Sequence, residues 1–144
     1  MGLVTWNDEL TEGLGRSGSR YRLSFERPSQ GGGRGRWRIE VDDAELCAVD
    51  TAEDAVRRAE GLEAIRCIIR GLSAELNEDQ LQYAEIIARE MMVAADQALA
   101  TAPSGDRTHI IQSSRSLRSV SEAIRRECTR REREDGAPVL PLPN

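Results

Sequence analysis

The sequence contains no lysine and a single histidine, and its three cysteines lie far apart. A GC-rich genome explains an all-arginine basic set as readily as a need for guanidinium groups does. Cys47, Cys67 and Cys128 never approach a C-x-x-C spacing, so we expect three free thiols. A zinc site of the usual ligand set would require distant cysteines and carboxylates to converge. The sequence therefore predicts neither a metal site nor a cofactor.

Long apolar runs are also missing from the 144 residues. No stretch approaches the roughly 20 apolar residues that a membrane-spanning helix requires. The first ten residues include Asp8 and Glu9 and lack the basic-then-apolar order of a signal peptide. The composition, 39% hydrophobic and 31% charged, is typical of one globular domain with polar extensions. We therefore expect a cytoplasmic protein that has no membrane partner.

The net charge of -5 is unevenly distributed along the chain. Residues 1–38 hold seven arginines against four acids, residues 39–99 hold five against fifteen, and residues 100–144 hold eight against six. An acidic middle thus lies between two mildly basic arms, which matters for the choice of partners. One hypothesis is that the acidic middle imitates nucleic acid and blocks a basic protein surface.

The clearest β pattern covers residues 20–42. Apolar side chains alternate with polar ones in two runs, a period of two that predicts the two strands of a β-hairpin; the apolar positions are Tyr21, Leu23, Phe25, Trp37, Ile39 and Val41. Residues 46–49 are compatible with a third short strand. Residues 1–19 contain Gly13, Gly15 and Gly18, so we predict a flexible N-terminal arm there.

Two amphipathic helices are predicted over residues 51–75 and 78–101, with Asp50 and Asn77 as their N-caps. Their short connection favours an antiparallel pair, which we expect to form the core under the hairpin. A third amphipathic helix is predicted over residues 108–134, with a thin apolar seam. The predicted fold is therefore α+β, with a single domain over 20–134 and a Pro-rich tail over 135–144.

The Gly-rich hairpin loop and its flanks raise the question of phosphate or nucleic-acid binding. Its glycines join two strands and no Lys-Ser/Thr follows them, so a phosphate-binding loop is disfavoured. Possible nucleic-acid contacts remain at Arg34, Arg36 and Arg38. The third helix is also basic, but its interleaved glutamates favour ion pairs along the helix.

Catalysis is not expected from this sequence. His109 and Ser113 are four residues apart on a predicted helix, yet no oxyanion element and no orienting acid beyond Asp106 accompany them. The leading interpretation is a non-enzymatic protein–protein interaction module, such as an adaptor, an assembly factor or a small inhibitor, that uses helix faces for self-association or a partner. The alternative is a nucleic-acid-binding or regulatory protein that uses the Arg-rich loop and the third helix. The residues expected to bind a protein partner are Tyr83, Ile86, Met92, Leu117, Val120 and Ile124.

Overall fold

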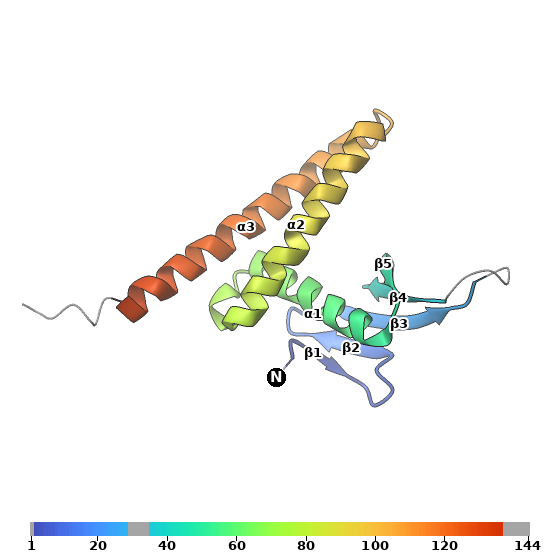
Figure 1. Cartoon of the computed structure of the whole chain (residues 1–144), viewed down its shortest axis with the longest axis horizontal. Coiled ribbons are helices and arrows are strands. Elements are labelled where there is room, and N and C mark those ends of the chain that lie inside the picture. The colour runs from blue at the N-terminus through green and yellow to red at the C-terminus, as the bar shows by residue number, and fades with distance from the viewer. Residues whose placement is uncertain (1, 29–34, 137–144) are drawn as a thin grey trace, which may run out of the picture. The chain divides into compact units, whose positions relative to one another are not determined.

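The computed structural model describes residues 2–28 and 35–136 and confirms the α+β fold (Figure 1). The chain divides into two compact units, Met1–Arg70 and Gly71–Asn144. The first unit contains an antiparallel sheet and helix α1. The second contains a short 3-10 helix, η1, and helices α2 and α3. Most of the predicted tail, from residue 137 onward, and Arg34 of the hairpin loop lie outside the described residues.

The sheet of the first unit has five strands in the order β1-β2-β3-β4-β5, each antiparallel to its neighbours. The predicted hairpin is β3 (Arg20–Glu26) and β4 (Arg36–Val41), in which Leu23 pairs with Ile39. The expected third strand is β5 (Ala44–Val49). A two-residue turn, Asp42 and Asp43, joins β4 to β5, and both residues have positive φ angles, as a type I′ turn requires.

The N-terminal segment is not a flexible arm, which corrects the prediction for residues 1–19. Strands β1 (Val4–Trp6) and β2 (Glu12–Gly15) extend the sheet beyond β3. The glycines of β2 provide space for side chains. A Cβ on Gly13 would meet Val4 and Trp6, and a Cβ on Gly15 would meet the carboxylate of Glu63. Glycine in a strand can mark such a close approach, and the sequence pattern alone suggested a break.

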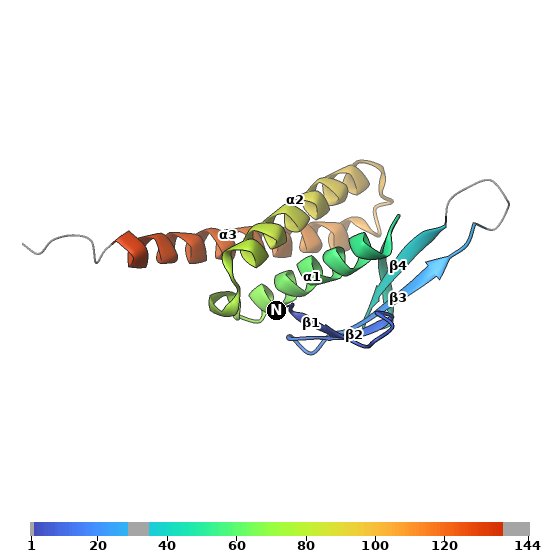
Figure 2. The same cartoon turned by 60° about the horizontal axis from the view of Figure 1, so that its bottom comes forward.

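Helix α1 (Ala52–Ile69) packs on the sheet (Figure 2), with Ala55 and Ala59 fully buried. The N-cap is Thr51, one residue after the predicted Asp50, and its hydroxyl accepts a hydrogen bond from Asp54 N. The helix ends six residues before the predicted 75. Gly71 takes a φ of +81°, a left-handed conformation that terminates a helix.

The second unit is a helical hairpin preceded by η1 (Ser73–Glu75). Helix α2 (Glu78–Thr101) begins at the predicted cap Asn77, which forms a capping box with Gln80. Helix α3 (Arg107–Gly136) runs back along α2 after a short connection (Figures 1 and 2). Of the predicted antiparallel pair, most of helix 51–75 belongs to the first unit and helix 78–101 belongs to the second. Within the second unit, the antiparallel partner of α2 is α3.

Candidate functional site

The most buried charged group of the described chain is the carboxylate of Glu63, on the sheet-facing side of α1. It accepts hydrogen bonds from the backbone N–H of Ser17, from the Ser17 hydroxyl at 2.9 Å and from the Tyr21 hydroxyl at 2.7 Å. Burial, reinforced by this bond to Glu63, raises the pKa of Tyr21 well above its ordinary value. Both Glu63 and Tyr21 are almost inaccessible to solvent, so the geometry indicates a structural link between α1 and the sheet.

A chain of polar contacts continues from Glu63 to the protein surface. The Ser17 and Ser19 hydroxyls are 3.1 Å apart, and Arg66 Nη1 donates to Ser19 Oγ at 2.9 Å. The same guanidinium nitrogen donates to Asp42 Oδ2 at 3.2 Å. If the Ser19 hydroxyl donates to Ser17, every group in the chain is satisfied, with Arg66 as the first donor and Glu63 as the last acceptor. Buried polar groups are normally paired in this way.

A second carboxylate of α1 holds the edge strand of the sheet. Glu60 Oε1 and Oε2 accept the backbone N–H groups of Leu3 and Val4, both at 2.7 Å. An edge strand leaves such groups without a strand partner, so a carboxylate that accepts two of them anchors β1. Glu60 and Glu63 are three residues apart and therefore lie close together on α1. Together they explain why the N-terminal segment is ordered onto the body of the unit.

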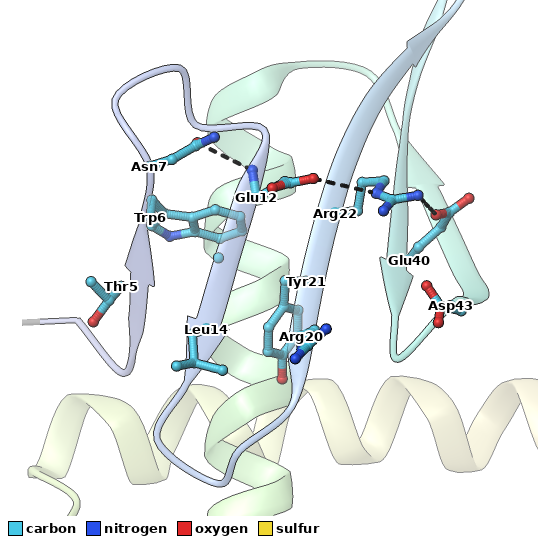
Figure 3. Close-up of a pocket in the computed structure, with 11 residues that line it drawn as sticks. Thr5, Trp6, Asn7, Glu12, Leu14, Arg20, Tyr21, Arg22, Glu40 and Asp43 are labelled. Carbon is cyan, nitrogen blue, oxygen red and sulfur yellow. Dashed lines mark hydrogen bonds and ion pairs between the residues drawn. The ribbon is translucent and has the colours of Figure 1, made fainter.

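The sheet also carries a hollow of about 480 Å³ (Figure 3). It is lined by consecutive residues of β1 to β3 and by two residues of the β4–β5 hairpin, and Arg22 lies across from Glu12 and Glu40. Arg22 forms ion pairs of 3.9 Å with both acids, and Figure 3 shows the three side chains in a row. In this row, the carboxylates of Glu12 and Glu40 are paired with the guanidinium group of Arg22. The hollow is lined by Thr5, Trp6, Asn7, Glu12, Gly13, Leu14, Arg20, Tyr21, Arg22, Glu40 and Asp43.

In the second unit, the carboxylate of Glu127 is buried. It accepts hydrogen bonds from Arg130 and from Arg131, and these bonds hold the pKa of Glu127 below its ordinary value. Arg131 also donates to the backbone carbonyls of η1 and of Leu76, which fixes the loop before α2 against α3. The glutamates that interleave with arginines in the sequence thus have a structural role on this side of α3.

His109, considered for nucleophilic chemistry with Ser113, is not brought near Cys128, the cysteine of the same helix. His109 lies exposed in the first turn of α3. Cys128 lies about five turns further along the helix, at a hollow of about 330 Å³ between α2 and α3 that Arg131 also lines. Among the residues with assigned positions, no group of three or more His, Cys, Asp or Glu is arranged to hold a metal ion.

The six residues expected to bind a protein partner separate into two sets. Leu117, Val120 and Ile124 are buried within the chain, so they offer no free surface. Their thin seam is the apolar side of α3, where α2 packs. On α2, Ile86 has 46% of its surface exposed. Tyr83 and Met92 are half-buried.

The arginines proposed for nucleic-acid contact are engaged with the sheet where they are described. Arg36 donates to the Ala48 carbonyl at 3.1 Å and lies 3.7 Å from Asp50. Arg38 lies 3.7 Å from Glu26 on the neighbouring strand. Pairs of opposite charge between neighbouring strands are common on the solvent-facing side of a sheet. This part of the nucleic-acid hypothesis gains no support from the geometry.

Sequence reasoning found only Met92 of a longer uncovered segment, the far half of the helical hairpin, residues 89–116, which we name the distal hairpin. All of its residues are described, and none of them is buried. The apolar residues of this segment are Met91, Met92, Val93, Leu99, Ile110 and Ile111, with alanines at 94, 95, 98, 100 and 102. Val93 has 56% of its surface exposed, and Met91 and Ile111 each have 37%. The apolar positions were visible in the sequence, but only the structure shows that the chain leaves them uncovered.

None of the helices in the described ranges combines the length and apolar character of a membrane span. Comparison of the chain with protein-family models, with curated proteins and with solved structures finds no match in any of the three. Any functional assignment must therefore be argued from the surfaces described above.

Proposed function

We propose that this chain is a non-enzymatic protein–protein interaction module and that the distal hairpin is its contact surface. The observation that supports this proposal is the absence of any buried residue in positions 89–116, in a segment that carries six large aliphatic side chains. Helical stability in proteins comes mostly from the packing of an apolar face. A two-helix arm without its own core therefore gains stability when another surface covers it.

The occupant that fits this arm best is the distal hairpin of a second copy of the chain. Two antiparallel helical hairpins complete a four-helix bundle, in which each helix buries an apolar stripe against two neighbours. A two-fold symmetric contact of this kind uses the same patch on both subunits. The small side chains of α2, four alanines between positions 94 and 100, allow close approach of a second helix. In this proposal Met92 lies within the contact, and Tyr83 and Ile86 lie beside it on α2.

Sedimentation velocity over two decades of protein concentration tests the proposal. The wild type is expected to shift from monomer toward dimer as concentration rises. The double variant Met91→Glu with Val93→Glu places charges on exposed positions and should stay monomeric across the range. The control variant Leu14→Glu with Ile69→Glu makes the same change at two exposed apolar positions of the first unit and should behave as the wild type.

Two outcomes would overturn the proposal. The first is a wild type that remains monomeric at the highest concentration. The second is a dimer that both double variants weaken equally, since that result would not depend on the distal hairpin. Circular dichroism of each variant establishes that the helices are retained. A cytoplasmic setting belongs to the same proposal and is compatible with the three free cysteines, of which Cys67 is buried.

A further inference from the structure

The arginines of α3 separate into two sets with different surroundings. Arg130 and Arg131 bind Glu127 and neighbouring groups, as described above, and Arg107 donates to the Leu99 carbonyl at 3.0 Å. The remaining five arginines are exposed, and we name them the arginine face: Arg115, Arg118, Arg125, Arg126 and Arg133. Within the described ranges, none of these five guanidinium groups has a hydrogen bond or an ion pair.

The five side chains lie on one side of the helix. At about 100° per residue, their positions fall within an arc of roughly 100°, and the buried Leu117, Val120 and Ile124 lie on the opposite side. From Arg115 to Arg133 the arc extends about 27 Å along the helix axis. Glu122 lies within the arc and Glu132 at its margin, so arginines outnumber acids there. The sequence shows a mixture of signs, whereas the structure separates a paired side from an unpaired, basic side.

We propose that the arginine face binds the phosphate backbone of a double-stranded nucleic acid, independently of base sequence. The guanidinium fork matches phosphate oxygens in a bidentate geometry, and every cation on this face is a guanidinium. A length of about 27 Å corresponds to roughly eight base pairs at 3.4 Å per pair. The row of five arginines is therefore about as long as the phosphate backbone of roughly eight base pairs.

Two other anionic surfaces fit this face less well. A helix that lies on a membrane inserts a broad apolar face, and the apolar side chains opposite the arginine face, Leu117, Val120 and Ile124, are already buried. An acidic protein surface would normally be held by aromatic or large apolar anchors at the centre of the contact, and α3 contains no Trp, Tyr or Phe. Regularly spaced phosphates need neither feature. The overall charge of -5 opposes binding, so we expect the interaction at low salt.

The test is fluorescence anisotropy of a labelled DNA duplex of roughly 20 base pairs of mixed sequence, titrated with the full chain at several salt concentrations. Five phosphate contacts predict a slope of about -4.5 for log K against log salt. That slope corresponds to a roughly 500-fold loss of affinity between about 50 and 200 mM salt. The triple variant Arg118→Gln, Arg125→Gln and Arg126→Gln should reduce the steepness of the slope by about 2.7, because three contacts are lost.

A charge-matched control separates this face from a net-charge effect. Arg27, Arg57 and Arg70 are exposed in the first unit and have no ion pair with a described residue, so their triple change to glutamine alters the net charge equally. We expect the control to keep the wild-type slope. Absence of binding at the lowest salt, or equal losses for both triple variants, would overturn the proposal. Binding to vesicles that contain phosphatidylserine, without binding to the duplex, would also overturn it and would indicate a membrane surface instead. Sedimentation of the same variants shows whether the proposed self-association is affected, so the two proposals can fail separately.

Discussion

Replacement of Glu63 by alanine should destabilise the first unit more than any other single carboxylate change. The variant removes the acceptor for the Ser17 backbone N–H and the Tyr21 hydroxyl, both of which are buried. A buried donor without a partner costs about 1–3 kcal/mol, so these two together cost about 2–6 kcal/mol. The cavity left by the shortened side chain adds about 1 kcal/mol. We therefore expect a loss of about 3–7 kcal/mol in the free energy of unfolding.

Urea denaturation followed by tryptophan fluorescence measures this loss directly. Both tryptophans, Trp6 and Trp37, belong to the first unit, so their emission reports on the unit that contains Glu63. The centroid of the Trp6 ring lies 6.3 Å from that of the Tyr21 ring, which places one reporter beside the bond that is removed. The matched control is Glu9→Ala, because Glu9 is exposed and its carboxylate has no hydrogen bond with a described residue.

A double-mutant cycle isolates the contribution of the tyrosine hydroxyl. Tyr21→Phe removes the donor, so the combination with Glu63→Ala no longer leaves that donor without a partner. The double variant should therefore be more stable than the sum of the single losses predicts, by about 1–2 kcal/mol. If Glu63→Ala and Glu9→Ala both fall within about 0.5 kcal/mol of the wild type, the carboxylate does not link helix and sheet, and our reasoning is refuted.

Three further predictions concern other positions. Gly15→Ala should cost about 1–3 kcal/mol because its Cβ would overlap the Glu63 carboxylate, whereas Gly105→Ala, which meets no atom within 4 Å, should be nearly neutral in thermal unfolding followed by circular dichroism. Because the pKa of Tyr21 is raised on folding, its contribution to stability is complete below the ordinary tyrosine pKa. Above about pH 10 the free energy of unfolding should fall by about 1.4 kcal/mol per pH unit. Urea titrations at several pH values measure this slope, and Tyr21→Phe should abolish it. The hydroxyl of Ser121 is buried without a hydrogen-bond partner among the described residues, so Ser121→Ala should raise stability by about 1 kcal/mol, and an unchanged or lowered melting temperature would contradict this.

Several local features could be read from the sequence because they depend on near neighbours in the chain. The alternation around Leu23 and Ile39 predicted the β3–β4 hairpin, and the structure pairs these two residues across it. Asn77 was predicted as a cap because a short polar side chain satisfies free N–H groups of the following turn, and the structure has it as the N-cap of α2. Periods of two and of 3.6 residues follow from backbone geometry, so they are visible without any knowledge of tertiary packing.

The candidate surfaces could be predicted only in part. The apolar residues of α2 and the arginines of α3 were recognised as candidates, and Ile86 is exposed as a contact residue must be. Leu117, Val120 and Ile124 were assigned to a partner surface, yet they are buried within the chain. A periodic apolar seam shows that a helix packs against something, and it does not show what the packing partner is.

The α+β class, the approximate places of the helices and the central hairpin can be predicted from the sequence, because those features follow from local periodicity and capping. Tertiary structure decided the rest. Gly13 and Gly15 look like chain breakers, and they belong to a strand because side chains from β1 and α1 fill the space that a Cβ would take. The arginines of α3 look evenly mixed with acids, and they form a paired side and an unpaired side because Glu127 is buried and binds two of them. Which groups are free for a partner depends on contacts between residues distant in sequence, and such contacts leave no periodic pattern in the chain.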